Sequence, residues 1–154
     1  MREILFRGKD DINGEWRTGF MVDSSHIGNW VYACPVDPET VGQFTGLADK
    51  NGEEIFEGDI VKQTFEKTVA IAIADFWDGD EYADLYGEDV GVVVILPSKG
   101  ACIKNPIIHR EVNGVTTQDG ETAKMYKNIC SGRCEVIGNI HDNPELLEVQ
   151  HEIE

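Results

Sequence analysis

Two cysteines and a histidine late in the chain are the residues whose types could hold a metal ion. Cys130 and Cys134 are separated by three residues, and His141 follows after six more. Thiolates and imidazole nitrogens are zinc ligands, but a structural site needs a further ligand, and this spacing matches no familiar zinc ribbon. The other interpretation is that Cys134 is a small buried side chain at the start of a strand. We therefore predict no metal and no cofactor, and keep zinc at Cys130, Cys134 and His141 as the alternative.

A pair of carboxylates could carry acid–base chemistry. Glu57 and Asp59 flank Gly58 in a sharp bend, and paired carboxylates act as acid and base when their surroundings separate their pKa values. In a turn, a carboxylate more commonly accepts hydrogen bonds from backbone amides. The chain contains no nucleophile elbow, phosphate-binding glycine loop or dinucleotide fingerprint. We therefore predict no catalytic residue, and an enzyme that uses the 57–59 carboxylates remains an alternative function.

The segment 75–89 combines seven carboxylates with several aromatic side chains and has no Lys or Arg. Counted from Asp78, the segment has acidic residues at the first and third positions of a calcium-binding loop. Tyr82 and Ala83 stand at the fifth and sixth positions, where that loop needs an acid and a glycine. Aromatic side chains are enriched at protein interfaces. The segment therefore predicts an acidic insertion loop that contacts a partner. The predicted contact residues are Trp77, Tyr82, Leu85 and Tyr86.

The charge balance excludes one class of function. The 154 residues include 29 Asp and Glu against 13 Lys and Arg, a formal net charge of −16. Affinity for nucleic acid comes largely from cations that displace phosphate counterions, so we expect no direct nucleic-acid binding. A protein partner with a basic surface fits the charge better. No apolar run approaches the length of a membrane span, and the first residues lack an apolar leader, so we expect a cytoplasmic protein.

Alternating apolar residues and turn dipeptides predict mostly strands. Residues 2–8 and 15–22 predict a hairpin, and the stretch 41–61 predicts a strand, a turn at Asn51-Gly52, a bend at 57–59 and a new strand. Further strands are predicted at residues 30–34, 68–76, 90–96, 106–112, 115–118 and 135–140. The fold class that follows is mainly β, a β-dominated α+β fold. Its expected form is a small bent SH3-like barrel, or a sheet, elaborated by hairpins.

Two short helices are expected beside the strands. Residues 121–129 place Thr122, Met125 and Ile129 at helical spacing. Near the end of the chain, Asn143 fits as an N-cap with Pro144 at the first helical position. The tail 150–154 is expected to fray.

Three groups of residues resemble one known family. They are Gln43-Phe44-Thr45-Gly46-Leu47, Asp49-Lys50-Asn51-Gly52 and Glu57-Gly58-Asp59-Ile60-Val61, with Arg2-Glu3-Ile4-Leu5-Phe6-Arg7 before them and Cys134-Glu135-Val136-Ile137-Gly138-Asn139 after them. Together they resemble the YopX-like family of phage and prophage proteins, clearly at both ends of the chain and only weakly in its middle. The resemblance implies a single mostly β domain over residues 1–154, in a bacterial host cytoplasm, and no catalytic residues.

These observations lead to three expected functions. The first is a non-enzymatic phage or prophage accessory protein that binds other proteins and forms a homo-oligomer through its edge strands. The second is an acidic decoy of nucleic acid that inhibits a host DNA- or RNA-binding protein. The third is the enzyme or zinc protein described above.

Overall fold

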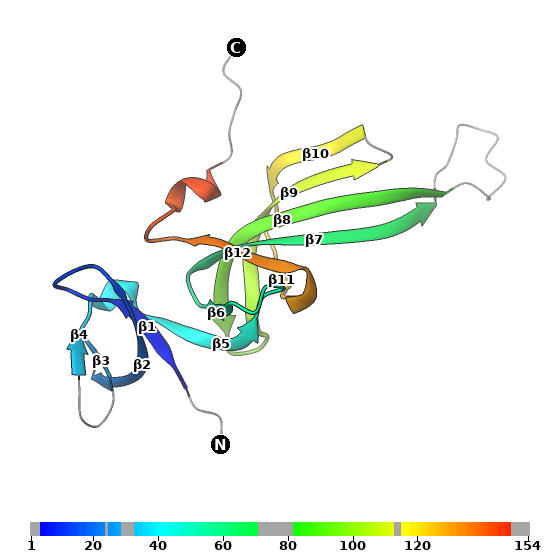
Figure 1. The fold of residues 1–154 in the computed structure, drawn as a ribbon. Coiled ribbons are helices and arrows are strands. Elements are labelled where there is room, and N and C mark those ends of the chain that lie inside the picture. Colours follow the sequence, from blue (N-terminus) through cyan, green and yellow to red (C-terminus); the bar gives the residue numbers. More distant parts are fainter. Residues whose placement is uncertain (1–3, 24, 29–32, 71–81, 113–114, 149–154) are drawn as a thin grey trace, which may run out of the picture.

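The computed structural model describes residues 4–23, 25–28, 33–70, 82–112 and 115–148. In these residues the chain forms two antiparallel sheets of six strands each, which are seen side by side in Figure 1. The expected mainly β fold is confirmed. The sheets do not close into a barrel, so the SH3-like form is not what the described residues show.

The first sheet is built from the N-terminal third of the chain. Its strand order is β4-β3-β2-β1-β5-β6. The bounds are β1 Phe6–Lys9, β2 Trp16–Asp23, β3 His26–Gly28, β4 Ala33–Pro35, β5 Gly42–Ala48 and β6 Glu54–Phe56, with a 3₁₀ turn η1 at Pro38–Thr40. The predicted hairpin of the first two strands is confirmed. Its turn is organised by Asp10, whose Oδ1 accepts a hydrogen bond from the Ile12 amide at 2.8 Å.

The second sheet contains much longer strands. Its order is β10-β9-β8-β7-β12, and β11 pairs with β9 outside that path. The bounds are β7 Asp59–Ala70, β8 Tyr82–Leu96, β9 Gly100–Val112, β10 Val115–Thr122, β11 Tyr126–Asn128 and β12 Cys134–Asn139, with 3₁₀ turns η3 at Ser131–Arg133 and η4 at Pro144–Leu147. No helix of the described residues is long and apolar enough to cross a membrane.

The stretch 41–61 joins the two sheets, because backbone amides in its two bends donate hydrogen bonds to carbonyl groups of the second sheet. The Gly58 amide donates to the Val93 carbonyl at 2.9 Å, and the Lys50 amide donates to the Cys134 carbonyl at 2.9 Å. Gly58 has φ 92°, which only glycine adopts without strain. The buried core lies under this joint. It consists of Ile55, Val61, Val93, Ile103 and Cys134, with Leu47, Ile129 and Val136 packed against it.

Strand β12 covers only the first part of β7. Its pairing runs from Asn139 opposite Asp59 to Cys134 opposite Gln63. Beyond Gln63 only β8 pairs with β7 in the described residues. We call residues 64–70 of β7, 82–89 of β8 and 107–112 of β9, together with β10, the distal arm. Figure 1 shows it extending away from the first sheet.

Two sequence predictions of secondary structure were wrong. The helix expected at 121–129 is replaced by the end of β10 and by β11, whose Lys127 pairs with Ile103 of β9. Strand pairing therefore outweighed the helical spacing of a short segment. Residues 82–89 of the expected acidic loop belong to β8, while 71–81 lie outside the described residues. Near the C-terminus, the expected helix is the four-residue 3₁₀ turn η4, and the Asn143 side chain makes no capping bond.

Candidate functional site

Asp49 in the first bend of the stretch 41–61 serves the fold. Its Oδ1 accepts hydrogen bonds from the amides of Asn51 and Glu53, both at 2.9 Å. Its Oδ2 accepts from the Val136 amide of β12 at 3.0 Å. Burial acts to raise the pKa of Asp49, but these amide bonds outweigh it and hold the pKa below its usual value. The carboxylate of Asp49 therefore stabilises the bend with one oxygen and connects it to β12 with the other.

Asp59 in the second bend pairs with an arginine of the first sheet. Its carboxylate is 1% exposed, and Oδ1 lies 2.5 Å from Nη2 of Arg7. Its Oδ2 accepts a hydrogen bond from the Phe56 amide at 2.8 Å. Burial raises the pKa of Asp59, and the nearby Arg7 only partly opposes this. Glu57, the other carboxylate of the predicted pair, is half-buried and appears in none of the ion pairs of the described residues.

Arg7 is held between two aromatic rings at the same place. Its guanidinium carbon lies 4.6 Å from the centre of the Trp16 ring and 4.9 Å from that of Phe56. Cations over aromatic faces are stabilised by the ring quadrupole, more strongly where water is excluded. Arg7, Lys9, Trp16, Phe56, Asp59, His141 and Asp142 together make a cluster that we call the inter-sheet junction.

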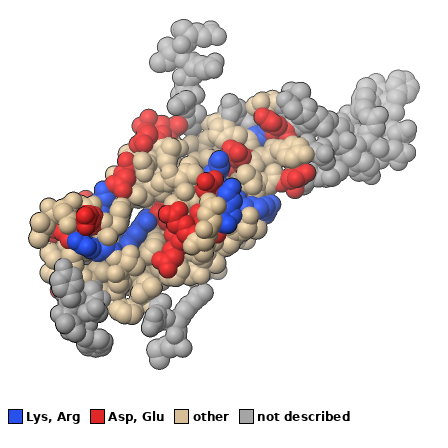
Figure 2. Space-filling model, viewed as in Figure 1, with Lys and Arg blue, Asp and Glu red and all other residues tan. Residues whose placement is uncertain are grey.

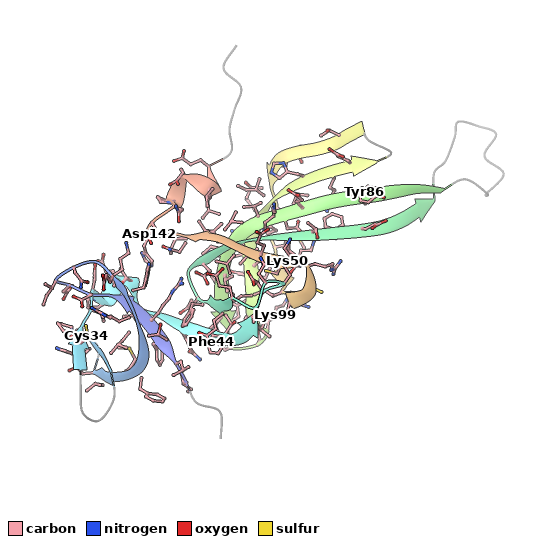
Figure 3. The ribbon with its side chains drawn as sticks, viewed as in Figure 1. Cys34, Phe44, Lys50, Tyr86, Lys99 and Asp142 are labelled. Atoms are coloured by element: carbon pink, nitrogen blue, oxygen red, sulfur yellow. The ribbon has the colours of Figure 1, made fainter. Side chains whose placement is uncertain are left out.

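Asp142 completes the junction from the loop after β12. It pairs with Lys9 and accepts a hydrogen bond from Nε1 of Trp16 at 3.0 Å, and Figure 3 shows it between the first sheet and β12. Hydrogen bonds from Lys9, Asn139 and Trp16 hold the pKa of Asp142 far below its usual value. The charges of the junction are therefore paired with one another and connect the sheets.

The three residues of the alternative zinc site do not share one position. Cys134 begins β12, whereas His141 follows its other end, which at about 3.3 Å per residue places them roughly 20 Å apart along the strand. Burial raises the pKa of Cys134 to about 11, which disfavours the thiolate that binds zinc. His141 packs against Trp16, with ring centres 6.0 Å apart. In the part of the chain that the structure describes, no three His, Cys, Asp or Glu side chains could together hold a metal ion.

Three of the four predicted contact residues belong to β8 of the distal arm, and two of these three face opposite sides of the sheet. Trp77 lies outside the described residues, and Tyr82 begins β8. Leu85 and Tyr86 are neighbours in β8, so their side chains point to opposite faces of the sheet. Tyr86 is 46% exposed, whereas Leu85 is half-buried. Of Leu85 and Tyr86, Tyr86 is thus the exposed one, and Figure 3 marks its place on β8.

The register of three strands surrounds Tyr86 with carboxylates. Tyr86 lies opposite Glu66 of β7 on one side and Glu111 of β9 on the other. Glu88 follows two positions along β8 on the same face, opposite Thr64 and His109. We call this surface the open face: Thr64, Glu66, Tyr86, Glu88, His109 and Glu111. No ion pair in the described residues joins its three carboxylates to a Lys or Arg.

A shallow hollow lies in the open face. Its volume is about 340 Å³, and its lining includes Tyr86, Glu88, His109 and Glu111. Thr64, Glu66, Tyr86 and Glu111 are exposed, while Glu88 and His109 are half-buried. Sequence reasoning missed the contributions of β7 and β9. Polar residues stand next to Glu66 and Glu111 as well, at Lys67 and Arg110, so no two-residue alternation marked the exposed side of either strand.

The opposite face of the arm carries cations and is packed. Phe65 lies across from Gly87 and fills the space where a side chain at Gly87 would sit. Nζ of Lys127 lies 4.4 Å from the centre of the Phe65 ring and pairs with Asp89, which is fully buried. The two faces of the same strands therefore differ: one is an anionic surface, and the other is closed by side chains with paired charge.

A larger hollow of about 570 Å³ lies between β5 and the turn from β8 to β9. Phe44 and Lys99 mark its two sides in Figure 3. Lys99 is the one charged side chain in its lining, Gln43 and Thr45 are polar, and the others are apolar or glycine. The open face offers three carboxylates around an exposed aromatic ring, so it is the stronger candidate for a charged partner.

The chain matches a family model. This model, described as YopX protein, covers residues 11–148, which is most of the sequence. No curated protein matches the chain. The matched range includes the inter-sheet junction from Trp16 onward, the distal arm and β12.

Proposed function

The chain belongs to the YopX protein family, and on that premise we propose that it is a non-enzymatic phage or prophage accessory protein that binds another protein. The binding surface is the open face of the distal arm, and the partner carries a basic surface. The observation that supports this is Tyr86, 46% exposed and flanked across both neighbouring strands by Glu66 and Glu111. An exposed aromatic side chain with charged groups around it is typical of an interaction surface.

Electrostatics favours a cationic partner for this surface. Like charges on neighbouring strands repel one another, and a cation bound between them relieves that repulsion. The whole chain carries a formal net charge of −16, so its long-range field also attracts basic proteins. The acidic decoy stays a separate prediction. It requires carboxylates gathered without cations, and on the face shown in Figure 2 Lys and Arg lie among Asp and Glu.

The proposal is tested with a short peptide of mixed Lys and Arg, whose binding is followed by amide NMR and calorimetry. We expect salt-sensitive binding with the largest shifts at Tyr86, Glu88 and Glu111. The triple variant Glu66→Gln, Glu88→Gln, Glu111→Gln should weaken binding about tenfold, since three exposed ion pairs contribute together about 1–2 kcal/mol.

A matched variant separates the open face from overall charge. Glu53, Glu54 and Glu148 are exposed and lie outside the arm, around the start of β6 and after η4. Changing all three to Gln removes the same charge and should alter binding by less than about threefold. Equal losses in the two triple variants would show that the peptide responds only to net charge, and the open face would not be the binding surface.

A further inference from the structure

We propose that the hollow of the open face binds an arginine side chain of the partner in preference to lysine. This rests on the proposed function and names the chemical group that the surface selects. Three observations carry it: an exposed aromatic ring, carboxylates on several sides of that ring, and a hollow of side-chain size.

The carboxylates are arranged around the ring and not in a row. Glu66 and Glu111 lie on the two strands that flank Tyr86, and Glu88 lies two positions further along β8. Side chains directly opposite on neighbouring strands have Cβ atoms about 5 Å apart. A planar guanidinium has several N–H donors pointing in different directions, so it can reach two of these carboxylates at once. An ammonium group acts as a point charge and lacks that fixed fork.

The Tyr86 ring supplies the second reason for arginine. Arg stacks on aromatic faces more readily than Lys, with a gain of about 0.5–1 kcal/mol at exposed sites. The same chain already uses this chemistry at the inter-sheet junction. There Arg7 lies 4.6 Å from the Trp16 ring centre while it pairs with Asp59.

The hollow is large enough for one side chain. Its volume of about 340 Å³ is near the lower limit of ordinary ligand pockets. Its lining also includes Gly87 and Phe65, and the Phe65 ring fills the space where a side chain at Gly87 would sit. Lining groups that are already packed lose little further freedom on binding, which lowers the entropy cost.

The test uses two peptides of equal length and charge, one with Arg and one with Lys, each spaced by Gly and Ser. Against the unaltered chain, the Arg peptide should bind about three- to tenfold tighter, from one stacking contact and one bidentate pair. Tyr86→Phe keeps an aromatic face and should retain that preference. Tyr86→Leu should reduce it to less than about twofold, with thermal unfolding used to verify that the variant folds.

The outcomes separate this inference from the proposed function. Equal binding of both peptides to the unaltered chain, still lost in the triple Glu→Gln variant, overturns the arginine preference and leaves the binding surface standing. An Arg preference that persists in Tyr86→Leu overturns the stacking role of Tyr86. If neither peptide binds, both proposals fail.

Discussion

Strand β7 carries one carboxylate at its first residue and another past its middle, and their surroundings are opposite. At its start, Asp59 is 1% exposed and pairs with Arg7 between two aromatic rings. Seven residues later, Glu66 is exposed and has no Lys or Arg partner among the described residues. Burying an unpaired charge is very costly, whereas an exposed charge remains solvated by water. The inter-sheet junction therefore uses its charges to build the fold, and the open face leaves its charges available for binding.

The largest expected effect is on the junction. Asp59→Ala leaves the Arg7 guanidinium buried without its counter-charge and removes the acceptor of the Phe56 amide. Breaking a buried pair in this way costs about 3–5 kcal/mol. Denaturant unfolding measures the loss. Asp59→Asn keeps an oxygen acceptor and should lose less, and a loss below about 1 kcal/mol for Asp59→Ala would contradict a structural role for the pair.

The next effect tests the packed face of the arm. A Cβ at Gly87 would overlap the ring of Phe65, so Gly87→Ala should cost about 1–3 kcal/mol through overpacking. The double variant Gly87→Ala, Phe65→Leu removes the ring and should recover part of that stability. If the double variant is less stable than the unaltered chain by the sum of the two single losses, the two residues are not in contact.

A third effect concerns pH at the junction. Hydrogen bonds from Lys9, Asn139 and Trp16 lower the pKa of Asp142 in the folded chain. Its contribution to stability is therefore complete above the unfolded pKa of about 4 and is lost as pH falls toward the folded value. Compared with the unaltered chain, Asp142→Asn should be less stable at neutral pH. The difference in unfolding free energy between the two proteins should shrink between about pH 4 and pH 2. A difference that grows on acidification would contradict a lowered pKa for Asp142 in the folded chain.

The smallest effect is expected on the open face. Glu66→Gln with Glu111→Gln removes like charges on the two strands beside Tyr86. Stability should change by less than about 0.5 kcal/mol, toward greater stability, because repulsion decreases and no packing is lost. Thermal and denaturant unfolding provide the measurement. A loss of more than about 1 kcal/mol in the free energy of unfolding would show that these two side chains stabilise the fold, as Asp59 does.

The local elements were predictable where short-range chemistry decides them. The turn at Asn51-Gly52 and the bend at 57–59 follow from residues that accept positive φ, and Gly52 and Gly58 adopt φ 82° and 92°. The role of Asp59 as an acceptor of a backbone amide was also predicted and is seen at Phe56. The strand β11, which stands where the sequence predicted a helix at 121–129, was not predictable, because the residues of β9 that it pairs with are distant in sequence.

At the candidate site, the sequence predicted Tyr86 as a contact residue within an acidic segment. It also assigned Leu85 to the same contact surface, and it did not include Glu66 or Glu111. Strand alternation separates the first two, and pairing among β7, β8 and β9 brings the others together.

Composition and local pattern alone therefore determined a β-rich, strongly acidic chain with two sharp bends in the stretch 41–61. Tertiary structure decided which charges are buried and which are exposed. The reason is that Arg7 and Asp59 are distant in sequence, and only the docking of the first sheet against the bend removes water from both. The same strand alternation that buries Asp89 on one face of the arm leaves Tyr86 exposed and Glu88 half-buried on the other.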